Sequence, residues 1–281
     1  MTLAIDATLL GYYPIRELDV SVKLAPIERR SRMLNLRDIC AFVTGASGGI
    51  GREFVLELLR RGASRVYAAD KVAVDTGVLD CNPKVVPLEL DITDEEAVGL
   101  AAARSRDVQL LINSAGINLR APFIATRSLA AARREMETNY FGTLAMCRAF
   151  APTLATHKNK GGSAIVNVAS ILGKVTLPNL GSYCASKAAI LRLSEGVRAE
   201  LAPQGTHVVL VLPWAVDTPM SSAFQGKKTP AVEVAARTLD GVENGLDDVL
   251  LHEYSFEIER RLGQDAKRLE YELAATFRKA P

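Results

Sequence analysis

Short runs of aliphatic and β-branched residues alternate with longer stretches of helical periodicity from about residue 39 onward. The runs predict strands at residues 39–44, 65–70, 85–90, 108–113, 164–169 and 208–212. The helical stretches lie between them, at residues 50–61, 95–104, 130–155 and 182–201. Such alternation is typical of βαβ units and a parallel sheet. Several strands are unbroken runs of Val, Ile and Leu, which a strand needs when helices cover both of its faces. We therefore predict an α/β fold with a doubly wound parallel sheet.

Both ends of the chain lie outside this alternation. Residues 1–36 are predicted to form an N-terminal extension, in which apolar residues alternate with polar ones at residues 18–24. That period favours one added strand, and a partly disordered tail is the alternative. Residues 37–281 are predicted to form a single domain that ends in an amphipathic helix. Its apolar residues recur at steps of three and four, at Ile258, Leu262, Ala266, Leu269, Leu273 and Phe277. This apolar face must be buried against another surface, and the sequence leaves open whether the domain itself or a second subunit provides that surface.

Composition and charge narrow the class of protein. A chain of 281 residues with 48% apolar content fits one large domain. Lys and Arg total 34 against 32 acids, and the small excess is spread along the chain, which argues against nucleic acid as a partner. The four cysteines lie far apart and without metal-ligand spacing, so we expect reduced thiols and no metal site. No apolar run reaches the roughly 18 residues of a membrane span, and the early acids argue against a targeting leader. We therefore expect a cytoplasmic protein that does not enter a membrane.

A glycine-rich turn follows the first predicted strand and opens a predicted helix. Residues 44–51 read Thr-Gly-Ala-Ser-Gly-Gly-Ile-Gly. Gly45 permits a tight turn, Gly49 lets the backbone approach a pyrophosphate, and Gly51 lets helix and strand pack closely. Ser47 and Ile50 complete the loop that we expect to contact a cofactor. An ordinary turn is the alternative, but a strand before and a helix after are the context in which such a loop binds a dinucleotide. The sequence therefore predicts a Rossmann fold.

The end of the second predicted strand bears on the choice between NAD and NADP. Asp70 lies about 20 residues after the glycines, where a carboxylate accepts hydrogen bonds from the adenosine ribose hydroxyls. A 2′-phosphate would meet a like charge there, so NAD is favoured. Lys71 follows at once and can reach a phosphate, so NADP stays open.

The spacing of the glycine loop and the motif Tyr-Cys-Ala-Ser-Lys at residues 183–187 resemble the short-chain dehydrogenase/reductase family. The resemblance extends over residues 38–224 and implies an NAD(P)-dependent oxidoreductase. It also implies that Asp91, with Ile92 beside it, contacts the adenine ring. Residues 113–116 read Asn-Ser-Ala-Gly and resemble the family's Asn-Asn-Ala-Gly, with a serine at the second position. The cofactor contacts expected there are Asn113, Ala115 and Gly116, with the alternative that Asn113 only holds the sheet together.

Four residues match the family's catalytic tetrad in order. Tyr183 and Lys187 are four residues apart on a predicted helix and project from one face. A tyrosine pKa near 10 is too high for proton exchange at neutral pH, and a nearby ammonium lowers it by stabilising the phenolate. Both residues are also expected to contact the cofactor. The resemblance implies that Ser170, at the end of the fifth strand, binds the substrate oxygen, and that Asn139 holds a water linking Lys187 to solvent. Each residue alone has a structural alternative, and their conjunction is what predicts the tetrad.

The segment after the sixth predicted strand departs from the family. Pro213 is followed by Trp214 where the family usually has glycine, so an indole fills space near the reacting carbon, with core packing as the alternative. Pro213, Val216 and Thr218 are expected to contact the nicotinamide. Residues 218–230 are short for a lid, which leaves the pocket open or closed by one end of the chain. The expected substrate lining is apolar: Ile171, Leu172, Val175, Leu177, Trp214, Met220 and Phe224. A hydrophobic ketone or alcohol fits such a lining better than a sugar or a charged acid.

Together these features predict an oxidoreductase that moves a hydride between a nicotinamide cofactor and a hydrophobic ketone or secondary alcohol, with Tyr183 as acid and base. One alternative is a non-redox enzyme on the same scaffold, such as a dehydratase, cyclase or epimerase. The other is a nucleotide-sensing binding protein. The presence of both Tyr183 and Lys187 argues against these alternatives. The helix at residues 130–155 resembles the family's subunit-interface helix, so we expect a homodimer or homotetramer.

Overall fold

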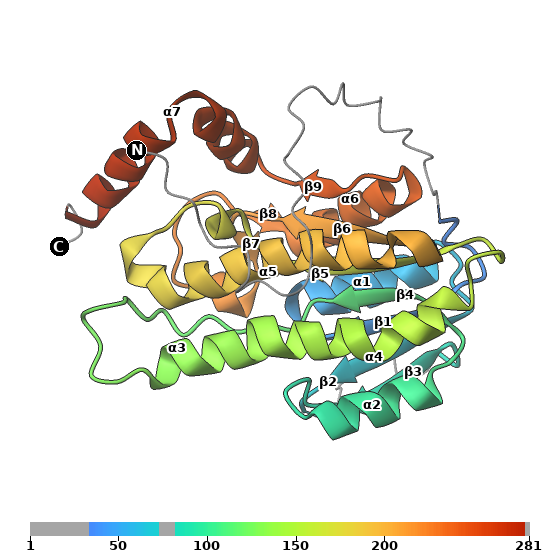
Figure 1. Ribbon diagram of the computed structural model, residues 1–281. Helices are drawn as coiled ribbons and strands as arrows, with labels where there is room; N and C mark the ends of the chain where they lie inside the picture. The colour runs from blue at the N-terminus through green and yellow to red at the C-terminus, as the bar shows by residue number, and fades with distance from the viewer. Residues whose placement is uncertain (1–33, 73–81, 279–281) are drawn as a thin grey trace, which may run out of the picture. The chain divides into compact units, whose positions relative to one another are not determined.

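Seven parallel strands form one sheet in the computed structural model, which describes residues 34–72 and 82–278. The strand order is β3-β2-β1-β4-β5-β6-β9 (Figure 1). The bounds are β1 Cys40–Thr44, β2 Arg65–Asp70, β3 Val85–Glu89, β4 Val108–Asn113, β5 Ser163–Val168, β6 Thr206–Leu212 and β9 Asp248–Leu250. The predicted α/β fold with a doubly wound parallel sheet is thereby confirmed. All six predicted strands are present to within two residues, whereas β9 was not predicted because three residues are too few to show a pattern.

Helices cover both faces of this sheet (Figure 1). On one face lie α1 Gly49–Arg60 and α6 Ala231–Glu243, and on the other lie α2 Glu95–Arg104, α4 Thr143–Ala155 and α5 Gly181–Leu201. The predictions for α1, α2 and α5 are correct to within one residue at each end. The sequence analysis missed α6, although its buried residues Val234, Leu239 and Val242 recur at helical spacing. Among the described helices, none combines the length and apolar character that a membrane span requires.

The core consists of two apolar layers, one on each face of the sheet. On one face Phe42 of β1 packs against Phe150 of α4, with ring centroids 4.8 Å apart. On the other face Leu34 and Leu36 are buried among residues of α1 and α6. These two leucines lie on the extension's side of the expected boundary at residue 36, and the strand expected at residues 18–24 lies outside the described residues. Burying each such side chain contributes about 1.5–3 kcal/mol.

The helix expected at residues 130–155 is continuous but changes its winding. It runs through α3 Ala130–Glu135, a π-helical segment η3 Met136–Gly142, and α4. Single π-helical turns within α-helices are frequently found at functional sites. Asn139 lies in this segment and is fully buried.

The C-terminal helix α7 Glu253–Arg278 bends at Asp265, where the backbone leaves helical geometry (Figure 1). The Asp265 carboxylate accepts a hydrogen bond from the Arg268 backbone N–H at 2.9 Å and so caps the second half. The stripe residues that pack against the domain are Ile258, Leu262, Leu269 and Leu273. They contact Ile171, Val175 and Trp214, so the domain itself provides the cover that the sequence left open. Ala266 is exposed, and the side chain of Phe277 lies outside the described residues.

A short parallel pair, β7 Val216–Asp217 and β8 Thr229–Pro230, brackets the segment that is short for a lid. Between the two strands the chain forms one short 3-10 helix, η7 Pro219–Ser221. The pairing of β7 with β8 brings the two ends of this segment next to each other. This keeps the segment close to the carboxyl end of β6, where the site described next is located.

Candidate active site

A cavity of about 590 Å³ opens at the carboxyl ends of β1, β2, β3 and β4. In open parallel sheets this is where ligands bind, at the point where the strand order reverses. The predicted cofactor residues that line it are Gly45, Gly49, Ile50, Gly51, Asp70, Lys71, Asp91, Ile92, Ala115, Gly116 and Thr218. Lining residues that were not predicted for either ligand are Gly48, Leu90, Thr93, Ser114, Ile117, Arg134, Glu137, Thr138 and Pro219, and Met220, expected to contact the substrate, lines this cavity too. The glycine loop and the two loops after β2 and β4 therefore meet around one cavity.

Glycine is required at two positions of the loop by close approach. A Cβ at Gly51 would lie 2.0 Å from the Gly45 carbonyl oxygen, so only glycine lets α1 pack against the end of β1. Gly45 has φ +70°, and a Cβ there would lie 2.9 Å from the Ala115 backbone. Gly45 thus allows the turn and also lets the loop after β4 approach. No side chain caps the first N–H groups of α1, which leaves them free for an anion.

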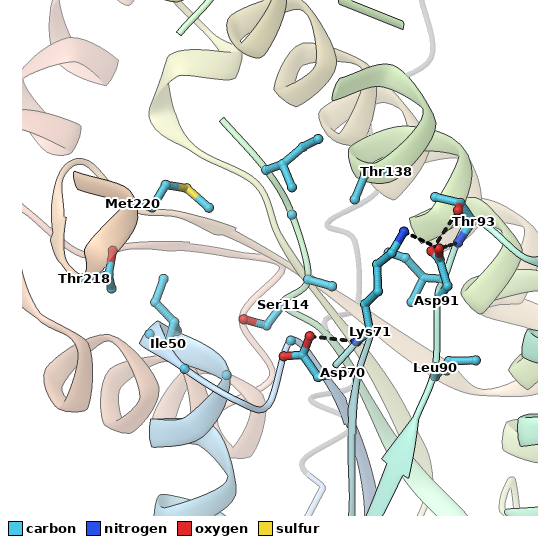
Figure 2. A pocket seen from close by; sticks show the side chains of 18 of the residues that line it. Ile50, Asp70, Lys71, Leu90, Asp91, Thr93, Ser114, Thr138, Thr218 and Met220 are labelled. Atoms are coloured by element: carbon cyan, nitrogen blue, oxygen red, sulfur yellow. Dashed lines mark hydrogen bonds and ion pairs between the residues drawn. The ribbon is translucent and has the colours of Figure 1, made fainter. Parts of the chain in front are cut away.

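Charged side chains cluster at the far end of this cavity (Figure 2). Asp70 accepts hydrogen bonds from the backbone N–H groups of Ser47 at 3.0 Å and Lys71 at 2.7 Å, which leaves lone pairs on both oxygens. The Lys71 ammonium lies 2.5 Å from the Asp91 carboxylate. Burial opposes ionisation of Asp91, but hydrogen bonds from Lys71 and Thr93 prevail and lower its pKa. Lys71 is therefore already paired within the protein.

Several predicted cofactor residues lie outside the lining of this cavity. Ser47 turns its hydroxyl into the protein, where it is buried and has no hydrogen-bond partner among the described residues. Asn113 is buried in the sheet and donates to the Asn167 side chain at 2.9 Å, in line with the alternative that it holds the sheet together. Pro213 contributes its carbonyl oxygen to Ser170 at 3.3 Å. The buried Lys187 does not line the cavity either, while Tyr183 and Val216 line its neighbour.

That neighbour is a second cavity of about 310 Å³, which shares Ile50, Thr218 and Met220 with the first. Ser170 and Tyr183 line it. Of the expected substrate residues, those in the lining are Leu172, Leu177, Trp214, Met220 and Phe224. Predicted cofactor residues Ile50, Val216 and Thr218 line it as well, and the lining residues that were not predicted for either ligand are Asn118, Arg120, Asn179, Leu180, Ala215, Ser221 and Ala223. The two cavities adjoin, so a ligand in one can meet a ligand in the other.

The structure corrects two of the expected substrate contacts. Ile171 and Val175 are absent from the lining of the second cavity. Ile171 is fully buried and packs against Ile258 and Leu269 of α7, and Val175 packs behind the wall as well. In the 3-10 helix that follows Ser170, Ile171 packs toward α7 while Leu172 lines the cavity. Trp214 belongs to both environments, since it lines the cavity and contacts Tyr254 of α7 with ring centroids 5.7 Å apart.

The catalytic candidates Ser170, Tyr183 and Lys187 lie together at the carboxyl ends of β5 and β6. Ser170 and Tyr183 line the second cavity together, and the Ser170 hydroxyl accepts from the Leu172 N–H at 3.1 Å. Lys187 lies with its Nζ 5.7 Å from the centre of the Tyr183 ring and donates to the Val168 carbonyl at 2.9 Å. Burial raises the pKa of Tyr183, and the Ser170 hydroxyl offsets only part of this rise. Burial also lowers the pKa of Lys187 to about 8. In the protein alone the pKa of Tyr183 is thus raised, by burial of the phenol, whereas the neighbouring ammonium was expected to lower it.

Asn139 is held by backbone and side-chain contacts on all sides. Its Oδ1 accepts from the Ile117 N–H at 2.8 Å, and its Nδ2 donates to the Ile117 carbonyl and to the Ser186 hydroxyl, each at 2.9 Å. Gly116 lies close to both Asn139 and Lys187. A Cβ at Gly116 would lie 3.1 Å from Asn139 Oδ1 and 3.5 Å from Lys187 Nζ. Asn139 therefore fastens the loop after β4 to α5. One lone pair of Oδ1 is left for a further donor, such as the water that the family resemblance implies.

A buried carboxylate that the sequence analysis missed supports this loop. Glu135 has no exposed surface, and its oxygens accept from the Leu119 N–H at 2.6 Å and from the Ser182 hydroxyl. Ser182 immediately precedes Tyr183 and also donates to the Ala121 carbonyl at 3.2 Å. The signal was in the sequence, because Glu135 is four residues before Asn139 and therefore on the same face of one helix. The contacts link the cavity loop to the start of α5.

Glu135→Ala is expected to lower the free energy of unfolding by about 2–4 kcal/mol, because it leaves a buried N–H and a buried hydroxyl without their acceptor. Chemical denaturation followed by circular dichroism measures this. The matched control is Glu195→Ala, which removes an exposed acid of α5 paired with Arg192 at the surface and should cost less than about 1 kcal/mol. Equal losses in the two variants would contradict the role given to Glu135.

Comparison with known proteins identifies the class of protein that this fold and site define. Residues 39–229 match the short chain dehydrogenase family, so the chain belongs to the short-chain dehydrogenases/reductases and is NAD(P)-dependent. Among solved structures it resembles a short chain dehydrogenase from Burkholderia cenocepacia J2315 in complex with NADP, with 42% identity and a TM-score of 0.81 over 88% of this chain and 100% of the other. A relative from Burkholderia phymatum in complex with NAD shares the fold, with 23% identity and a TM-score of 0.74 over 85% and 97% of the two chains.

Two curated relatives support the same assignment. Dehydrogenase/reductase SDR family member 7B of Danio rerio is 31% identical over 214 residues, which are 71% of this chain and 68% of the relative. Short chain dehydrogenase mpl6 of Monascus purpureus is 35% identical over 217 residues, which are 70% of this chain and 73% of the relative.

Proposed function

We propose that this oxidoreductase transfers a hydride between its nicotinamide cofactor and a hydrophobic ketone or secondary alcohol. The observation that carries the proposal is that Ser170 and Tyr183 line one largely apolar cavity, which adjoins the dinucleotide cavity. A carbonyl oxygen placed between these two hydroxyls would have a donor on either side. Leu172, Leu177 and Trp214 surround that place and favour an apolar substrate.

The residues around the first cavity suit a nicotinamide dinucleotide. The uncapped start of α1 and the loop of Gly45, Ser47, Gly49, Ile50 and Gly51 would hold the pyrophosphate. Other candidate contacts are Asp70 for the adenosine ribose, Asp91 and Ile92 for the adenine, Asn113, Ala115 and Gly116 for the loop after β4, and Pro213, Val216 and Thr218 for the nicotinamide. When bound, the cofactor supplies or accepts the hydride.

Tyr183 is the proposed acid and base. In reduction it donates its phenol proton to the substrate oxygen while Ser170 holds that oxygen. Burial raises the pKa of Tyr183, which keeps the phenol protonated at neutral pH and suits this donation. The ammonium of Lys187, whose Nζ lies 5.7 Å from the centre of the Tyr183 ring, then stabilises the phenolate that is left. Binding of the nicotinamide ribose by Lys187 is part of the same proposal. In alcohol oxidation the same phenolate takes the proton from the substrate hydroxyl.

The test is to follow NADH and NADPH absorbance with purified protein and a panel of bulky apolar ketones. Oxidation of the cofactor that depends on Tyr183 supports the proposal. A reaction that requires cofactor but changes no absorbance would favour the non-redox alternative, a dehydration, ring closure or epimerisation. Binding of cofactor without any turnover would favour a nucleotide-sensing protein.

We propose further that NAD is the preferred cofactor. Asp70 lies at the end of the cavity proposed for the adenosine ribose and has lone pairs that accept no hydrogen bond from the described residues. Lys71 is bound to Asp91 (Figure 2). A 2′-phosphate would therefore face a carboxylate and a lysine that is already paired. NADP is the second candidate, since the relative from Burkholderia cenocepacia was solved with NADP. It would require Lys71 to leave Asp91.

Asp70→Asn is expected to lower kcat/KM for NADH by about 10- to 100-fold, the value of one charge-assisted hydrogen bond, and to raise it for NADPH. The amide keeps an acceptor for only one of the two backbone N–H groups, because Ser47 and Lys71 donate to different oxygens of Asp70. Steady-state kinetics with both cofactors measures this. Lys71→Met is the matched control and should leave the NADH value unchanged. Wild-type preference for NADPH that Lys71→Met abolishes would instead support NADP.

The proposed assembly is a homodimer or homotetramer. The support is the resemblance of α3, η3 and α4 to the family's interface helix, together with a hollow between α4 and α5 lined by residues such as Tyr140, Leu144 and Leu193. The division into an extension at residues 1–36 and a catalytic domain at residues 37–281 is likewise proposed from the sequence, and so is a cytoplasmic location.

A further inference from the structure

Arg120 is the only charged residue among the described residues that line the second cavity. All other members of that lining are apolar or neutral. Its guanidinium donates to the Met220 carbonyl oxygen at 3.2 Å, across the entrance of the cavity. Within the described parts of the chain no acidic side chain forms an ion pair with it. The dinucleotide cavity does not include Arg120 in its lining.

The chemistry of the side chain indicates what it can bind. A guanidinium carries five N–H donors in a planar fork, and the bond to Met220 uses one of them. The remaining donors match the two oxygens of a carboxylate, which arginine binds through paired hydrogen bonds. Asn118 and Asn179 line the same cavity and add neutral hydrogen-bonding groups.

The backbone holds Arg120 in place at an energetic cost. Arg120 has φ +53° and is one of two non-glycine residues with positive φ in the described chain. The Asn118 side chain stabilises this turn by accepting the Arg120 N–H at 3.0 Å. On either side, Leu119 is bound by Glu135 and Ala121 by Ser182. Strained conformations that are held this firmly cluster at ligand-binding sites.

We propose that Arg120 binds an anionic group of the substrate, so that the substrate is an apolar ketone or alcohol with a carboxylate at the end remote from the reacting carbon. This rests on the proposed function, since the second cavity must be the substrate site. It also revises the expectation that a charged acid fits poorly, which was formed without Arg120 in the lining. The apolar residues receive the body of the substrate, and the guanidinium fixes its charged end at the entrance.

The test measures binding rather than turnover. Trp214 is the only tryptophan of the chain and lines this cavity, so its fluorescence reports occupancy. The wild-type protein, saturated with NAD, is titrated with β-benzoylpropionate and with the uncharged amide of the same acid. Neither ketone can be reduced by the oxidised cofactor, so the complexes are stable during the titration. Arg120→Gln keeps a donor for the Met220 carbonyl but removes the charge, and Arg127→Gln removes an exposed positive charge from the same segment.

The acid is expected to bind at least about 10-fold more tightly than the amide in the wild type and in Arg127→Gln, because a charged hydrogen bond is worth more than a neutral one. Arg120→Gln should abolish this preference by weakening the acid alone. Two results would overturn the proposal: equal binding of acid and amide by the wild type, or a preference for the acid that Arg120→Gln retains. Arg120 would then have only the structural role of holding η7 through the Met220 carbonyl. Failure to reduce any ketone with NADH, while the acid preference holds, counts against the proposed function and not against the anion site.

Discussion

Tyr183→Phe is expected to lower kcat for ketone reduction by about 10³-fold while leaving the affinity for the cofactor nearly unchanged. Proton transfer by a positioned side chain contributes about 10²- to 10⁴-fold to a rate. The variant loses the proton donor but keeps the ring, which packs against Leu172 and Cys184. The fold should therefore survive the substitution.

The measurement is steady-state reduction of the best ketone of the panel, with cofactor binding followed separately by titration. Tyr140→Phe is the matched control, since it removes a phenol hydroxyl from η3 at the α4–α5 hollow, away from both cavities of the site. It should leave kcat within about twofold. A Tyr183→Phe enzyme that retains more than a tenth of the wild-type kcat would remove Tyr183 from its role as the acid.

Lys187→Met is expected to lower kcat by about 10²- to 10³-fold and, at neutral pH, to make the cofactor-free protein more stable than the wild type. The loss of rate follows from removing the ammonium that stabilises the phenolate. The gain in stability follows from burial, because Lys187 is nearly inaccessible and its charge has no carboxylate partner among the described residues. Methionine fills similar space without a charge, at the cost of the hydrogen bond to Val168.

The pH dependence of this stability difference has a definite sign. Burial lowers the pKa of Lys187 from 10.5 to about 8 in the folded protein. Below about pH 8 both states carry the ammonium, and the folded state bears the full cost of burying it, about 3 kcal/mol at roughly 1.4 kcal/mol per pKa unit. Between about pH 8 and 10.5 the unfolded chain binds more protons than the folded one, so the wild type gains stability as pH rises.

Denaturant unfolding of the cofactor-free proteins across this pH range tests the prediction. The advantage of Lys187→Met should be largest at neutral pH and should shrink toward pH 10.5. Lys158→Met is the control, since Lys158 is an exposed lysine that donates to the Pro203 carbonyl at 2.8 Å. It should show no such trend. A Lys187→Met protein that is less stable than the wild type at neutral pH would mean that the buried ammonium stabilises the fold.

Local pattern was enough to predict the scaffold of the domain and the candidate site. Buried parallel strands must be runs of Val, Ile and Leu, and Gly51 is required by its close approach to Gly45 within the same loop. Tyr183 and Lys187 share a face simply because they are four residues apart on one helix. The family membership, the sheet and the proximity of Ser170 to Tyr183 follow from such local signals.

Only the tertiary structure decided which surfaces meet. Periodicity shows that α7 has an apolar stripe but not that Ile171 and Trp214 cover it, so Ile171 was placed in the substrate lining when it packs behind it. Arg120 and Glu135 had no motif to mark them, because their importance comes from partners such as Met220 and Ser182 that are distant in sequence. The same holds for the pKa of Tyr183, which the neighbouring lysine was expected to lower and which burial raises. Burial and long-range contacts depend on the whole packed chain, and for that physical reason no local pattern contains them.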